Sequence, residues 1–302
     1  ISMTPSNAFT ALQSFVNNKP FDSTLPDVEA NKISVQSTLK DITNTTTTPL
    51  VASSGLSMQY AIMMGLIDDA LEKHSGKSIK FIVPPNCYGG TNDQARRVAA
   101  CLESVDIVDL PVDGENDMVQ SLETVLSKIA IEDAVPYIIA EIPTNPRVEV
   151  PNLQELKKVL SKARYTSDNT AAIAPVFILD QTFCPNVHFL GDNDILSEVK
   201  AISYASGSKF PSGGKSTAGY CVANTEAKQV LDKIEVHLTL CDNEATAHQY
   251  EILAKQLPSM TKRIDEAYKN TREFVNFIKI TLPDAKINFV TETLANDGFT
   301  PS

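Results

Sequence analysis

The first candidate for chemistry is Lys209, a lysine in the small, hydroxyl-rich segment 203–214. Ser206, Gly207 and Ser208 come directly before it, after a short apolar run. A lysine amine can form a Schiff base with an aldehyde cofactor, and neighbouring hydroxyl and backbone N–H groups can hold a phosphate. The same residue types also occur in ordinary solvated loops. The segment therefore indicates cofactor chemistry only together with other motifs.

A phosphate site is a second candidate, at Gly55 and Leu56. Two serines come before them, and a helical spacing of apolar residues follows. The first N–H groups of a helix lack partners within the helix, and the helix dipole favours an anion there. Ser206 and Ser208 could complete the phosphate site. Plain helix capping by the two serines explains the same pattern.

Three further residues have side chains suited to a flat, charged cofactor. Asp180 ends an apolar run, where an unpaired carboxylate is costly to bury and a pyridinium N–H would be a good partner. Asn145, held between two prolines, could direct its amide at a ring hydroxyl. Tyr88 could cover a ring and relay protons near Lys209. A strand-end cap, a turn asparagine and a half-buried tyrosine are the structural alternatives.

Composition limits the class of protein. The 302 residues are 42% hydrophobic, which is enough for a sizeable core, and the net charge of −11 argues against a nucleic-acid partner. No apolar run is long enough to cross a bilayer and no signal pattern precedes the first helix, so we expect a cytoplasmic protein without a membrane partner. The five cysteines and four histidines are scattered, which predicts no metal site.

Strands and helices that would position these residues alternate from residue 50 onward. The predicted strands are 79–83, 106–110, 137–141, 176–179, 201–204 and 219–223, with a further strand at 286–290. The predicted helices lie near 7–16, 58–71, 96–102, 118–130, 153–165, 195–199 and 230–240, with a long stretch over 244–278 that is broken near Pro258. Such alternation predicts an α/β layer sandwich with a mostly parallel sheet and ligands at the carboxyl ends of its strands.

Three regions follow from this pattern. Residues 1–50 form an N-terminal arm that is loop outside 7–16, because turn signals dominate it. Residues 51–240 form a large cofactor-binding domain. Residues 241–302 form a linking helix and the beginning of an incomplete, small C-terminal α+β domain.

Five short motifs, in this order, resemble the Cys/Met-metabolism family of pyridoxal 5′-phosphate (PLP) enzymes, which includes cystathionine γ-synthase, cystathionine β-lyase and methionine γ-lyase. They are Ser-Ser-Gly-Leu at 53–56, Tyr-Gly-Gly-Thr at 88–91, Glu-Ile-Pro-Thr-Asn-Pro at 141–146, Asp-Gln-Thr-Phe at 180–183 and Ser-Gly-Ser-Lys-Phe at 206–210. The resemblance covers about residues 50–280. It implies a fold-type-I PLP-dependent transferase-like fold, a three-layer αβα sandwich. It also implies a PLP-dependent carbon–sulfur lyase or γ-replacement enzyme of sulfur amino-acid metabolism.

The same resemblance implies a role for each candidate residue. Lys209 would form the internal aldimine and shuttle the proton of the substrate Cα. Asp180 would pair with the pyridine nitrogen, Tyr88 would stack on the ring, and Asn145 would contact the ring hydroxyl. The residues that would bind the cofactor phosphate are Gly55, Leu56, Ser206 and Ser208.

Some features depart from the family pattern. Ser208 stands where the family usually has threonine, and residues 1–50 contain no Tyr-x-Arg motif. The family's arginine for the substrate carboxylate lies in a C-terminal domain that this sequence barely begins, and Arg147 receives no assignment. Another fold-type-I reaction, such as amino transfer, and a non-catalytic binding or oligomerisation role therefore remain alternatives.

The resemblance also implies a homodimer or homotetramer acting on a small amino acid.

Overall fold

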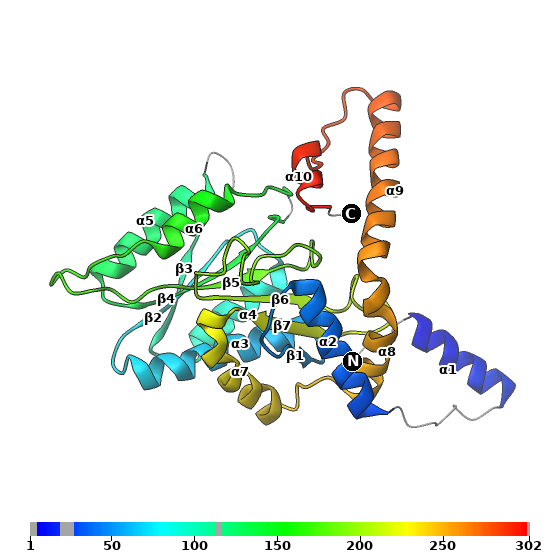
Figure 1. Cartoon of the computed structure of the whole chain (residues 1–302), viewed down its shortest axis with the longest axis horizontal. Coiled ribbons are helices and arrows are strands. Elements are labelled where there is room, and N and C mark those ends of the chain that lie inside the picture. The colour runs from blue at the N-terminus through cyan, green and yellow to red at the C-terminus, as the bar shows by residue number, and fades with distance from the viewer. Residues whose placement is uncertain (1–4, 19–26, 113–115, 146, 301–302) are drawn as a thin grey trace.

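A seven-stranded sheet organises the chain in the computed structural model, which describes residues 5–18, 27–112, 116–145 and 147–300 (Figure 1). The strand order is β1-β7-β6-β5-β4-β2-β3. Strands β3, β2, β4, β5 and β6 pair in parallel, whereas β7 pairs antiparallel to both β6 and β1. The strands are β1 Leu50–Ala52, β2 Ile79–Val83, β3 Val105–Asp109, β4 Val135–Glu141, β5 Val176–Asp180, β6 Ala201–Ser206 and β7 Gly219–Ala223. The mostly parallel sheet is confirmed.

Helices cover both faces of this sheet. Along each strand, alternate residues point to opposite faces. Phe81 and Tyr137 pack with helices α3, α4 and α7, while Ile82 and Ile138 pack with α5 and α6. The helices are α1 Pro5–Asn17, α2 Val28–Thr43, α3 Gly55–Lys73, α4 Gly89–Ala100, α5 Met118–Ile131, α6 Leu153–Ser161, α7 Lys228–Leu240, α8 Ala247–Gln256, α9 Met260–Thr281 and α10 Glu292–Asn296. The three-layer αβα arrangement is confirmed.

Helix α2 corrects the prediction that residues 1–50 are loop outside 7–16. Asp27 caps this helix by accepting from the Ala30 N–H at 3.0 Å. Val35 and Leu39, one helical turn apart, are fully buried in a cluster formed with α8 and the start of α9. Sequence reasoning missed α2 because these few apolar positions lie among polar residues, so its stability comes from packing rather than from a strong amphipathic pattern.

Two predicted elements in the second half of the chain are also wrong. Residues 195–199 form turns rather than a helix, because the Asn224 side chain donates to the carbonyl oxygens of Leu196 and Val199. Residues 286–290 form no strand. Phe289 stacks instead on Tyr268 of α9, with ring centroids 5.5 Å apart. The break near Pro258 is confirmed, since a short 3₁₀ turn, Leu257–Ser259, separates α8 from α9. The division into domains stays a prediction.

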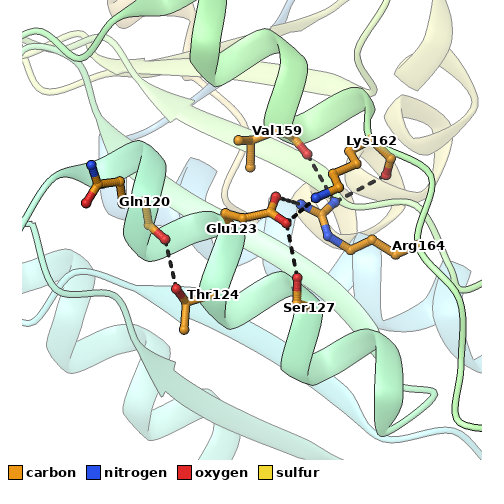
Figure 2. A network of polar contacts seen from close by, with 7 residues as sticks. All are labelled: Gln120, Glu123, Thr124, Ser127, Val159, Lys162 and Arg164. Carbon is orange, nitrogen blue, oxygen red and sulfur yellow. Dashed lines mark hydrogen bonds and ion pairs between the residues drawn. The ribbon is translucent and has the colours of Figure 1, made fainter.

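A polar network shortens α6, which was predicted to reach residue 165. Arg164 donates to the Val159 carbonyl at 3.0 Å and to the carboxylate of Glu123 on α5 at 2.7 Å (Figure 2). Lys162 binds the same carboxylate. The chain therefore leaves the helix after Ser161 and ties α6 to α5. None of the helices in the described residues is long and apolar enough to span a membrane.

Candidate active site

A cavity of about 310 Å³ lies at the carboxyl ends of the parallel strands. All eight residues singled out from the sequence line it, although they come from five separate motifs. They are Gly55, Leu56, Tyr88, Asn145, Asp180, Ser206, Ser208 and Lys209. A rim of this kind is where open α/β sheets bind their ligands.

The N-terminus of α3 supplies unpaired backbone donors to the cavity. Ser54 caps the helix: its hydroxyl accepts from the Ser57 N–H and its carbonyl from the Met58 N–H, each at 3.0 Å. The capping interpretation is thus confirmed for Ser54, whereas the Ser53 hydroxyl donates to the Ser57 hydroxyl instead. This capping leaves the N–H groups of Gly55 and Leu56 without an acceptor among the described residues. These two donors, at the positive end of the helix dipole, form a site suited to an anion.

Close backbone packing brings the serines of the lysine loop to this helix end. A Cβ on Gly55 would lie 3.0 Å from the Cβ of Ser206, and one on Gly219 would lie 2.4 Å from the Ser54 carbonyl oxygen. The Ser206 and Ser208 hydroxyls are 2.8 Å apart and both face the cavity. Glycine at these two positions therefore allows hydroxyl and amide donors from three segments to meet.

Asp180 places a buried carboxylate in the wall of the cavity. It ends β5 and accepts from the Thr182 N–H at 2.9 Å and from the Tyr204 hydroxyl. Burial raises the pKa of Asp180, while the bonds from Thr182 and Tyr204, together with the charge of Lys209, oppose the rise. A cation placed against this carboxylate would compensate its desolvation.

Lys209 and Tyr88 are the more exposed members of the site. Lys209 lies in the turn after β6, and among the described residues it forms no ion pair. Tyr88, at the start of α4, has half of its surface exposed. Both side chains are therefore accessible to a molecule that enters the cavity.

Several lining residues received no role from the sequence. Glu141 is the most significant, because it is a buried carboxylate at the end of β4, next to Asp180 in the sheet. It stood inside a motif, and the cost of burying an acid at a strand end could have singled it out. Other polar residues that line the cavity and received no role from the sequence are Gln59, Thr91, Thr182 and Tyr204. Arg147 is exposed, 3.8 Å from Glu149, and is not part of the lining.

A second cavity, of about 420 Å³, lies at the opposite end of the strands. Pro136 and Pro175, near the amino ends of β4 and β5, line it together with Arg164. The Arg164 guanidinium is already paired with Glu123 (Figure 2). None of the residues singled out from the sequence lies in this second cavity.

Comparison with solved structures shows that this fold is shared. The chain matches cystathionine gamma-lyase from yeast with a TM-score of 0.62 and 17% identity, covering 82% of this chain and 56% of that one. It matches metB from Corynebacterium glutamicum with a TM-score of 0.61 and 16% identity, covering 85% of this chain and 58% of that one. It matches the cystathione gamma lyase from Micromonospora echinospora with a TM-score of 0.55 and 14% identity, covering 76% of this chain and 52% of that one. The expected fold-type-I architecture is confirmed.

The chain spans a little over half the length of these structures. No family model matches the sequence, and no curated protein matches it either. At these identities the likeness shows the fold alone.

Proposed function

We propose that the chain belongs to a PLP-dependent enzyme of sulfur amino-acid metabolism, a carbon–sulfur lyase or a γ-replacement enzyme. The observation that carries the proposal is the convergence on one cavity of an accessible lysine, a buried carboxylate and two helix N–H groups that lack an acceptor among the described residues. The fold shared with two cystathionine gamma-lyases supports it.

The donor set of the cavity fits PLP. The free N–H groups of Gly55 and Leu56, with the hydroxyls of Ser206 and Ser208, offer donors to a phosphate, and the dipole of α3 favours its charge. Asp180, buried and without a cation in direct contact among the described residues, suits a protonated pyridine nitrogen. The phosphate would meet helix N–H groups that otherwise lack an acceptor, and the pyridinium would meet a carboxylate that otherwise lacks a cation in contact.

Each residue then has a distinct task. When bound, PLP supplies an aldehyde for covalent attachment and a ring that withdraws electrons from the substrate Cα. Lys209 would hold the cofactor through its Nζ and would take and return the Cα proton. Tyr88 would cover the ring and exclude water from one of its faces. Asn145 would orient the ring by contacting the ring hydroxyl. Asp180 would keep the ring nitrogen protonated.

Covalent labelling tests the proposal directly. The protein is incubated with PLP, reduced with borohydride, digested and analysed by mass spectrometry. We expect the pyridoxyl group on Lys209. A label on Lys215 or on no lysine would contradict the proposal. Release of a thiol and a 2-oxo acid from cystathionine or methionine then distinguishes a lyase from an aminotransferase.

Assembly and substrate belong to the same proposal. We expect a homodimer or homotetramer that acts on a small sulfur-containing amino acid, as the family resemblance implies. Light scattering after size-exclusion chromatography gives the mass in solution. A monomer at all concentrations would contradict this part of the proposal.

A further inference from the structure

Glu141 is a buried carboxylate whose only hydrogen bonds in the described structure come from backbone N–H groups. It is the last residue of β4, 7% exposed, and its Cα partner in β5 is Asp180. Among the described residues, no lysine or arginine forms an ion pair with it. A buried carboxylate without a cation is costly, so a role other than stabilising the fold needs to account for it.

The two oxygens of this carboxylate hold two different loops. Oε1 accepts from the Tyr88 N–H at 2.7 Å, and Oε2 accepts from the Asn145 N–H at 3.1 Å. Tyr88 follows β2 and begins α4, while Asn145 lies in the turn after β4. One side chain thus fixes the backbone of both residues that flank the cavity. An ionised carboxylate offers an acceptor oxygen to each of the two donors, whereas glutamine would present an N–H group to one of them.

The surroundings of Glu141 carry little compensating charge. The titratable groups that face it are Asp180 on β5, Cys87 in the loop before α4 and Tyr204 on β6. Burial and then the charge of Asp180 raise the pKa of Glu141 to about 7, against the effect of its two backbone bonds. Positive charge brought near Asp180 would favour the ionised, doubly accepting form of Glu141.

We infer that Glu141 is a positioning residue, whose carboxylate holds Tyr88 and Asn145 at the spacing that a bound PLP ring requires. The role toward a PLP ring rests on the proposed function. The connection of the two loops through the Glu141 carboxylate rests on its two hydrogen bonds alone. Glu141 lines the cavity, but this role requires no contact with substrate or reacting atoms. It acts by fixing the two backbones from which the contacting side chains extend.

Amide hydrogen exchange, resolved to single residues by mass spectrometry, tests this connection in the PLP-free protein. In Glu141→Gln at pH 8 we expect the amides of Tyr88 and Asn145 to exchange at least tenfold faster than in the wild type. Glu123→Gln is the matched control, because that carboxylate joins α5 to the segment after α6 (Figure 2). The control should leave both amides unchanged. Unchanged exchange in a folded Glu141→Gln protein overturns the inference.

Two further measurements cover the other outcomes. If Glu141→Gln does not fold, protection factors of the wild type are followed from pH 8 to pH 6. Protection at both amides should fall as Glu141 is protonated, and constant protection overturns the connection of the two loops. PLP affinity should fall at least tenfold in Glu141→Gln and stay unchanged in Glu123→Gln. If the wild type takes up no PLP while the amides of Tyr88 and Asn145 still exchange faster in Glu141→Gln, the proposed function is overturned. The same result establishes that Glu141 holds the two loops together.

Discussion

Glu141 and Asp180 are Cα partners in the parallel register of β4 and β5, so two buried carboxyl groups end neighbouring strands at one cavity. Burial raises the pKa of both, and the charge of Asp180 adds to the rise for Glu141. The site is therefore prepared for a cation. Several of its properties can be measured without a substrate.

The stability of the PLP-free protein should depend on the ionisation of Glu141. The pKa of Glu141 in the folded protein, about 7, is above the ordinary value of 4.5. Its protonation therefore adds to the unfolding free energy, fully below about pH 4.5, and this stabilisation is lost as the pH rises through 7. We expect the difference in unfolding free energy between wild type and Glu141→Gln to change by about 2 to 3 kcal/mol across this window, favouring the wild type at low pH. Urea unfolding from pH 4.5 to 8 measures it, and a constant difference would contradict the raised pKa.

Replacing Asp180 should separate stability from cofactor binding. Asp180→Asn removes a buried ionisable group whose pKa is raised by burial, so the PLP-free protein should unfold at the same urea concentration or a higher one. Its affinity for PLP should fall by about 10- to 100-fold, because a charged hydrogen bond is worth about 1.5 to 3 kcal/mol. Exposed Asp192→Asn is the control and should change neither quantity. Retained affinity in Asp180→Asn would exclude the pairing with the pyridine nitrogen.

Gly90 permits the position of the Tyr88 ring. A Cβ there would lie 2.5 Å from Tyr88 Cε1, whereas a Cβ on Gly89 meets nothing within 4 Å. Alanine favours helix by up to about 1 kcal/mol over glycine, so neither variant should lose stability. We expect Gly90→Ala to weaken PLP binding by displacing the ring, and Gly89→Ala to leave it unchanged. Equal affinities in the two variants would argue against stacking by Tyr88.

Gln249 joins the segment before α3 to the segment after the lysine loop. Its Nε2 donates to the carbonyls of Ser53 at 2.9 Å and Thr217 at 2.6 Å. Gln249→Leu leaves the Ser53 carbonyl unpaired and leaves the Thr217 carbonyl only the Ser216 hydroxyl as a donor, so it should lower the unfolding free energy by about 1 to 3 kcal/mol. It should also weaken PLP binding, because Gly55 follows Ser53 closely. Exposed Gln120→Leu should stay within about 0.5 kcal/mol of the wild type, as surface changes usually do. Urea unfolding measures both, and a neutral Gln249→Leu would show that the two segments hold each other without it.

Local patterns predicted most of the sheet and the convergence of the site. The strands at 79–83 and 219–223 match β2 and β7, because strands buried on both faces form continuous apolar runs between turn residues. The site residues could be predicted because each ends a strand, follows one or lies at the start of a helix. Helix α2 could not, since Val35 and Leu39 gain their burial from α8, far away in the sequence. Glu141 was missed because its hydrogen-bond partners are backbone N–H groups, which a sequence does not identify, and only its place at a strand end could have singled it out.

The visible absorption spectrum of the protein after incubation with PLP and desalting tests the central claim most directly. Lys209→Ala and Lys215→Ala are measured beside the wild type. We predict the absorption band of lysine-bound PLP in the wild type and in Lys215→Ala, and its loss in Lys209→Ala. A folded wild type without the band, or a Lys209→Ala protein that keeps it, would contradict the assignment of Lys209 as the residue that holds the cofactor.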